Sequence, residues 1–371
     1  MRERITRGAS FLIWPALAFL CARYYLQVNL GGENYKTADW LINFEGGPVR
    51  RALIGQILYL MSEAGPALKW VVFGVQVATY ALVFFQVHRL YLLRRRGPEW
   101  LVVFLCPAFL LFPFYDPQGG FRKEILVFVS FGGLALFYAR KKLTSTVIAL
   151  SLAVFLLAGF SHELTAFTLP FFAWLLFKAH RSGQISARQA AETITLFSVV
   201  ALGCLIGAAM YPGTVPVQEG ICASLSGRGF APDICDGAIR WLGVGREAAF
   251  ERVIEMLPLY LPVYPVLFVL AMIPLLLSSW WKDNVALLLT GFAFMLPLFV
   301  MATDWGRWIH IYVFFVFVSM LADSALQDIQ IRRLPVWLAC MYLTLWSIPH
   351  YQAAVTFGLP EFILKLVRHI R

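Results

Sequence analysis

Long apolar runs recur from one end of the chain to the other and are separated by short polar links. A helix that crosses a bilayer needs about 20 consecutive apolar residues, whereas a buried helix of a soluble protein is usually shorter or carries a polar face. The pattern therefore predicts an all-α fold, a polytopic transmembrane helical bundle of roughly ten or eleven spans. We expect the spans near residues 10–28, 67–88, 100–114, 125–139, 145–160, 164–178, 193–211, 257–277, 285–302, 309–322 and 335–349.

The polar stretches predict one integral membrane domain, residues 1–371, with two longer external loops at 29–66 and 212–256. Two segments fit no span. The stretch from Arg50 to Met61 is apolar but short, so it is expected to be an interfacial or re-entrant helix. The tail 357–371 places apolar residues along one helical face and predicts an amphipathic surface helix. In this scheme the tail ends on the external side, so the number of spans near the carboxyl end is left open.

Composition excludes a water-soluble protein, because 60% of the 371 residues are hydrophobic and only 14% are charged. The net charge of +10 does not indicate nucleic-acid binding, since the basic residues lie in the links between apolar runs. Dense Lys and Arg mark cytoplasmic links, so the amino terminus is expected inside and the first run is expected to be a retained span. These links contain Arg2, Arg4, Arg7, Arg89, Arg94–Arg96, Arg140–Lys142, Lys178–Arg188, Lys282, Arg332 and Arg333.

Cys222 and Cys235 share the second long loop and are expected to form a disulfide if that loop faces an oxidising compartment. A metal centre would need two more soft ligands, and the surrounding sequence offers none. We therefore expect no metal and no cofactor.

Charged residues of both signs lie at the external ends of the spans, on the side opposite the basic links. They come from four separate turns. Acids and bases at a membrane boundary are costly unless they are paired or functional. The set comprises Glu33, Asp39, Arg50, Arg51, Asp116, Arg122, Lys123, Glu124, His162, Glu163, Asp304 and Arg307.

Two glycine-containing motifs have a functional and a structural interpretation. In GGPVRR, residues 46–51, two arginines open a helix, where they either bind an anion or extend to lipid headgroups as an anchor. In DPQGGFRKE, residues 116–124, Arg122 and Lys123 lie on the disfavoured side for positive charge. They indicate a phosphate ligand, or else an ion pair with Glu124.

Two further motifs also have both a functional and a structural interpretation. His162 and Glu163 lie between two apolar runs. They form either a structural pair or an acid–base pair. In TDWGRW, residues 303–308, Asp304 and Arg307 are three residues apart and can pair on one helical face. Trp305 and Trp308 fit an interfacial aromatic belt, or stacking faces for a sugar.

Arginines beside carboxylates suit transfer from a polyprenyl phosphate or diphosphate, because guanidinium groups grip phosphate oxygens and a carboxylate can take a hydroxyl proton. No P-loop, dinucleotide-binding or HExxH motif is present. The layout resembles GT-C type glycosyltransferases, with a short basic amino terminus, a first span, an external loop with an acidic residue and later external acids. That resemblance implies a catalytic role for Asp39, with Glu33 as the second candidate. The RR, RK and DWGRW motifs are also similar to polysaccharide polymerases of the Wzy or EpsG kind, in which external arginines hold the lipid diphosphate.

These resemblances imply a glycosyltransferase of the bacterial inner membrane that acts in envelope polysaccharide or glycolipid assembly. Its expected partners are a polyprenyl-linked sugar donor, a glycan or lipid acceptor, and membrane lipids. Asp39, Glu163 or Asp304 is the expected base. The residues expected to bind substrate are Arg50, Arg51, Asp116, Arg122, Lys123, His162, Trp305, Arg307 and Trp308. A transporter or lipid flippase is the alternative, and it predicts ionisable groups near the middle of spans.

Overall fold

The structure, a computed structural model, describes residues 2–94, 96–351 and 356–370. Arg95 of the predicted basic link and Arg371 of the predicted tail lie outside these residues. The described chain is all-helical, and its extended pairing is limited to the isolated bridges Ser278–Ile331 and Ser347–Thr356. The helices of the first half are α1 (Arg2–Ser10), α2 (Ile13–Asn29), α3 (Lys36–Leu41), α4 (Leu53–Glu63), α5 (Leu68–Leu92), η1 (Pro98–Trp100), α6 (Leu101–Phe104), α7 (Phe112–Tyr115), α8 (Ile125–Ala139), α9 (Ser145–Ser161), η2 (Glu163–Thr168) and α10 (Leu169–Arg181).

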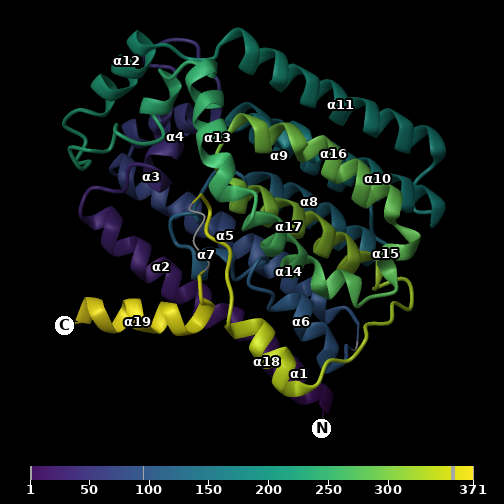
Figure 1. The fold of residues 1–371 in the computed structure, drawn as a ribbon. Coiled ribbons are helices and arrows are strands. Elements are labelled where there is room, and N and C mark those ends of the chain that lie inside the picture. The colour runs from purple at the N-terminus through teal and green to yellow at the C-terminus, as the bar shows by residue number, and fades with distance from the viewer. Residues whose placement is uncertain (1, 95, 352–355, 371) are drawn as a thin grey trace.

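The second half continues the bundle (Figure 1). Its helices are α11 (Ala187–Met210), α12 (Val215–Leu225), η3 (Arg240–Leu242), α13 (Arg246–Tyr260), α14 (Tyr264–Leu276), α15 (Trp280–Asp283), α16 (Val285–Met301), α17 (Trp305–Asp323), α18 (Val336–Thr344) and α19 (Gly358–Ile370).

Several helices are long and apolar enough to cross a membrane, which makes this a membrane protein by length and composition. Within the described residues they number four: Thr6–Asn29, α5, α11 and α17. Helices α13 and α14 add a fifth if the pair, bent by 73°, is one span. The apolar helices α8, α9 and α16 are shorter. The expected ten or eleven spans stay a prediction.

Helix α17 is the centre of the bundle, because every one of its residues is buried. It contacts α5, α8, α10, α14 and α16. A helix that is apolar all round belongs inside such a bundle.

Three of the predicted spans are not continuous helices, and each of them contains proline. Within 100–114, α6 and α7 are separated by an irregular segment that contains Pro107, and α7 itself starts around Pro113. Within 257–277, the chain bends between α13 and α14 at Pro262. Within 335–349, α18 ends at Thr344, before Pro349. Proline lacks the N–H that a helix requires and disfavours helical geometry in the residue before it.

Both short segments that fitted no span are helices. Helix α4 begins at Leu53, so Arg50 and Arg51 precede it and do not open it. Helix α19 covers most of the predicted tail, and its Phe362 ring packs against Phe19 and Phe114, with centroids 5.6 and 4.4 Å apart.

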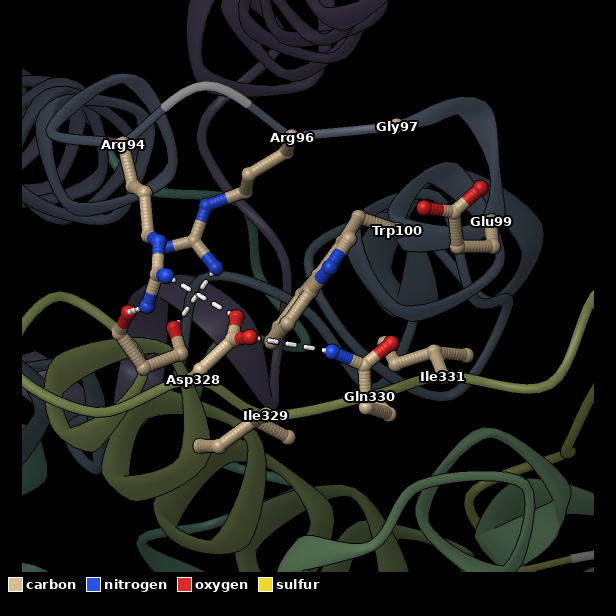
Figure 2. Close-up of a pocket in the computed structure, with 10 residues that line it drawn as sticks. Arg94, Arg96, Gly97, Glu99, Trp100, Asp328, Ile329, Gln330 and Ile331 are labelled. Carbon is tan, nitrogen blue, oxygen red and sulfur yellow. Dashed lines mark hydrogen bonds and ion pairs between the residues drawn. The ribbon is translucent and has the colours of Figure 1, made fainter.

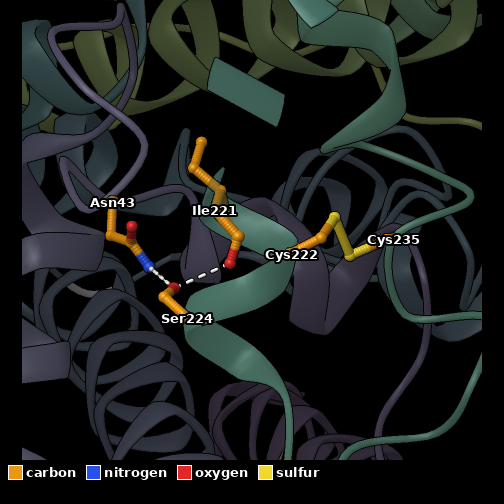
Figure 3. The surroundings of a disulfide bond; sticks show 5 residues. All are labelled: Asn43, Ile221, Cys222, Ser224 and Cys235. Atoms are coloured by element: carbon orange, nitrogen blue, oxygen red, sulfur yellow. Dashed lines mark hydrogen bonds between the residues drawn. A yellow bond between two sulfur atoms is a disulfide. The ribbon is translucent and has the colours of Figure 1, made fainter. Parts of the chain in front are cut away.

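The two ends of the bundle differ in character. Helices α3, α4 and α12 gather at one end, and α15 lies at the other (Figure 1). At the α12 end, Cys222 and Cys235 form a disulfide (Figure 3). The same helix approaches the chain that precedes α4, because Asn43 Nδ2 donates to Ser224 Oγ at 3.1 Å. The disulfide-bonded loop therefore lies against the segment that carries the RR motif.

Basic residues of the other end tie helix ends together. A small polar hollow of about 130 Å³ there is lined by Arg94, Arg96 and Asp328 (Figure 2). Arg94 pairs with Asp328 at 2.9 Å. Arg96 is buried and donates to the carbonyl oxygens of Leu90 and Leu321, in the last turns of α5 and α17. A cation at helix carboxyl ends neutralises their partial negative charge, so Arg96 has a structural role.

Candidate functional site

Charged side chains from five segments converge where the amino-terminal end of α17 meets α3, the chain before α4, the turn before α8, and η2. We call these residues the charged cluster: Asp39, Arg50, Arg51, Lys123, Glu124, Glu163, Asp304 and Arg307. All of them belong to the set that the sequence placed at the external ends of spans.

Glu163 binds both arginines of the RR motif. Arg50 Nη1 lies 2.6 Å from Glu163 Oε1, and Arg51 Nε lies 2.8 Å from Oε2. Burial alone raises the pKa of Glu163, but the charges and hydrogen bonds of the arginines outweigh it and hold the pKa well below its ordinary value. Both guanidinium groups are therefore already bound to one carboxylate, which balances one of their two positive charges.

Lys123 fixes the backbone at Arg51. Arg51 has a left-handed backbone with φ 69°, which is uncommon for a residue with a side chain. Lys123 Nζ donates to the Arg51 carbonyl at 2.6 Å and lies 3.9 Å from Asp39 Oδ1. Burial alone raises the pKa of Asp39, but Lys123 and nearby cations bring it down to about 2. Asp39 is therefore an ionised, enclosed partner of Lys123.

Arg307 joins two carboxylates. Its Nε and Nη2 lie 3.0 and 2.9 Å from the two oxygens of Glu124, and its Nη1 lies 2.6 Å from Asp304. The Asp304–Arg307 pair is the one that the three-residue spacing predicted. Asp304 is the more open partner, with 28% of its side chain exposed against 4% for Arg307.

His162 stands beside this network as a neutral ring. Burial, and then the charge of Arg51, hold its pKa well below the ordinary value. Its Nδ1 accepts a hydrogen bond from the Leu164 amide at 3.4 Å and lies 3.7 Å from Glu163. The geometry favours the structural interpretation of His162, because the strong partners of Glu163 are the arginines.

The DPQGGFRKE turn is anchored at Phe121. The Phe121 carbonyl accepts from Trp40 Nε1 at 2.8 Å and from Gln76 Nε2 at 2.8 Å. Its amide donates to Tyr80, and its ring stacks on Tyr24. These contacts fix the positions of Arg122 and Lys123, which follow directly.

Arg122 and Lys36 are buried cations without a carboxylate partner among the described residues. Arg122 is 5% exposed, its Nε has no hydrogen-bond partner, and its guanidinium lies 5.1 Å from the Tyr35 ring. Lys36 is 2% exposed and donates to Gln27 at 2.6 Å. Burial, together with the charge of Arg122, lowers the pKa of Lys36 to about 8, although the charge of Glu33 acts in the opposite direction. Sequence reasoning missed Lys36, although its place between Tyr35 and Asp39 was a usable signal.

Asp116 has a partner that the sequence did not indicate. His350 Nδ1 lies 2.7 Å from Asp116 Oδ2, and Gly119 N donates to Asp116 Oδ1 at 3.2 Å. Burial alone raises the pKa of Asp116, but the hydrogen bonds that it accepts from the ring and amide of His350 and from the Gly119 amide bring it below its ordinary value. Since 234 residues separate the two, only the folded chain reveals this pair.

Both tryptophans of TDWGRW are packed inside. Trp305 is 9% exposed and donates to the Phe299 carbonyl at 2.8 Å, and Trp308 is 3% exposed. Arg307 lies 5.2 Å from the Trp308 ring. These positions are unsuited to an open stacking face for sugar, because both rings are already covered by protein.

An apolar groove of about 660 Å³ runs between α13 and α16 and is bordered by Trp305. Other lining residues include Ile254, Leu257, Pro297 and Val300. The groove thus begins one residue from Asp304. As for metals, the described residues contain no group of three or more His, Cys, Asp and Glu side chains arranged to hold an ion.

Comparison with known proteins yields no relative. No family model matches the chain, and no curated protein or solved structure matches it at a significant level.

Proposed function

We propose that this protein is a membrane glycosyltransferase that moves a sugar or glycan from a polyprenyl phosphate- or diphosphate-linked donor at the extracytoplasmic face. The observation that carries the proposal is the convergence of the charged cluster with the unpaired cations Lys36 and Arg122. Enclosed like charges that form no ion pair are unfavourable, and a phosphate group would relieve their repulsion.

The phosphate role falls to Arg122 and Lys36 and not to the other arginines. Arg50, Arg51 and Arg307 already hold carboxylates at 2.6–3.0 Å, so their charge is balanced. They hold Glu163, Glu124 and Asp304 in place, and Lys123 holds Asp39. Neutralising the leaving phosphate supplies the electrostatic stabilisation that glycosyl transfer requires.

The groove beside Trp305 suits the hydrocarbon chain of such a donor. It is lined by apolar side chains of α13 and α16, and it begins next to Asp304. A lipid chain there would bring its phosphate toward the charged cluster from the side of the bilayer. The Cys222–Cys235 bond supports an oxidising compartment at this end, and so the extracytoplasmic face.

Gene deletion and single substitutions test the proposal. We expect deletion to remove an envelope glycan, and Arg122→Gln or Lys36→Met to lower its rate of synthesis at least tenfold, because each variant removes a charge from the phosphate site. Mass analysis of extracted glycans and lipid-linked precursors measures the product. Arg188→Gln and Lys142→Met make the same changes at exposed positions of other links and should leave the product unchanged.

The result also separates the alternatives. A polymerase of the Wzy or EpsG kind would leave single repeat units on the lipid, whereas a single-transfer enzyme would leave glycans that lack one sugar. A lipid flippase would leave complete precursors in the cytoplasmic leaflet. Unchanged glycans in the deletion strain would disprove the proposed function.

A further inference from the structure

His350 is a histidine held rigidly at the edge of the charged cluster by its backbone. Its carbonyl accepts from Gly306 N at 3.0 Å, and the preceding Pro349 carbonyl accepts from Tyr264 Oη at 3.1 Å. A Cβ on Gly306 would lie 1.9 Å from the Pro349 carbonyl, so only glycine allows this approach. The ring therefore stands beside the turn that carries Asp304 and Arg307.

Asp116 sets the state of the ring. Asp116 Oδ2 accepts from both the amide and the Nδ1 of His350, which assigns the Nδ1 proton to this hydrogen bond. The other nitrogen, Nε2, makes no hydrogen bond with any described residue and keeps its lone pair. A carboxylate behind an imidazole fixes its tautomer and orientation, which is the arrangement of a general base with its positioning residue.

Each carboxylate of the charged cluster already has a cationic partner. Asp39 is held by Lys123, Glu163 by two arginines, and Asp304 and Glu124 by Arg307. The partners of Asp39 and Glu163 hold the pKa of these two carboxylates below the ordinary value, so both are poor proton acceptors. The ionisable groups near His350 include Asp116, Tyr351 and Tyr264, and Lys36 of α3 interacts electrostatically with Asp116.

We propose that His350 Nε2 accepts the proton of the acceptor hydroxyl during glycosyl transfer, with Asp116 as its positioning residue. This inference rests on the proposed function. The acceptor oxygen forms a bond to the anomeric carbon while the bond from that carbon to the donor phosphate oxygen breaks. The electron pair leaves with the phosphate at Arg122 and Lys36, and the hydroxyl proton passes to Nε2 and then to water.

Chemical rescue in intact cells tests this role. His350→Gly should lower the rate of glycan synthesis about 10²-fold or more, the usual contribution of a general base, and added imidazole should restore part of it. His350→Asn keeps a donor for Asp116 at the Nδ1 position but removes the lone pair, so it should be as slow as His350→Gly. Asp116→Asn should cost less, and imidazole should not rescue it.

The controls distinguish a proton-acceptor role of His350 from a structural role. His180→Asn, in the last turn of α10, should keep full activity, and imidazole should not rescue Arg122→Gln. Normal synthesis in His350→Asn, or a loss in His350→Gly that imidazole does not restore, would overturn the proton-acceptor role while leaving the glycosyltransferase intact. Unchanged glycans in the deletion strain would instead remove the proposed function itself.

Discussion

At the scale of single residues, Glu163 is the carboxylate whose loss should be most damaging. Glu163→Gln leaves Arg50 and Arg51 without their anion, and removing one partner of a buried pair typically costs about 3–5 kcal/mol. We expect about 3 kcal/mol, because the arginine side chains are 22% and 25% exposed. Thermal unfolding in detergent measures the change. Glu192→Gln, which breaks the exposed pair with Arg188, should cost less than about 1 kcal/mol.

The same carboxylate predicts a pH dependence. Arg51 and Arg50 overcome burial and hold the folded-state pKa of Glu163 well below the unfolded value. Its contribution to stability is therefore complete above the unfolded pKa of about 4.3 and is lost as the pH falls toward the folded pKa. Below that value the stability of Glu163→Gln should approach that of the unmodified protein. An unchanged gap between the two down to the lowest accessible pH would contradict the ion-pair role.

Sequence reasoning found the residues of the charged cluster but not their partners. Charge, spacing and position at span ends were enough to select Asp39, Glu163 and Arg307, because such residues are costly in a membrane protein without a purpose. Pairing was predictable only for Asp304 and Arg307, which are three residues apart. The Arg51–Glu163 pair joins positions 112 residues apart, and no local pattern encodes such a contact. The arginines therefore looked like free phosphate ligands in the sequence.

At the scale of helices, Gly306 holds the start of α17 against the segment before α19. Gly306→Ala would place a methyl group 1.9 Å from the Pro349 carbonyl, and backbone cannot yield as a flexible side chain can. We expect at least a tenfold loss of glycan synthesis with normal membrane levels, because His350 would shift away from Asp304. Gly203→Ala is the matched control, since nothing lies within 4 Å of its added Cβ within a long apolar helix. Equal activity of the two variants would show that this contact is dispensable.

The helix boundaries show which helices the sequence pattern alone can locate. The apolar runs located α5, α8, α9, α11, α16 and α17 within a few residues, because length and hydrophobicity determine such helices. The runs 100–114, 257–277 and 335–349, which are not continuous helices, all contain proline, but so does α16, which stays helical around Pro297. An apolar run with proline is compatible with a kinked span or with a broken one, and tertiary packing decides between them.

At the scale of the whole molecule, the proposal requires the charged cluster and the basic links to lie on opposite sides of the membrane. Single cysteines at exposed positions, Asp233→Cys in the disulfide-bonded loop and Arg188→Cys at the start of α11, report the two sides. In a background with the exposed Cys340 replaced by Ser, a membrane-impermeant maleimide should label Asp233→Cys in intact cells and Arg188→Cys only after lysis. The positive-inside rule and the disulfide predict this orientation independently. Labelling of Arg188→Cys from outside would place the charged cluster in the cytoplasm, where a polyprenyl-linked donor would meet the enzyme before, and not after, its transfer across the membrane.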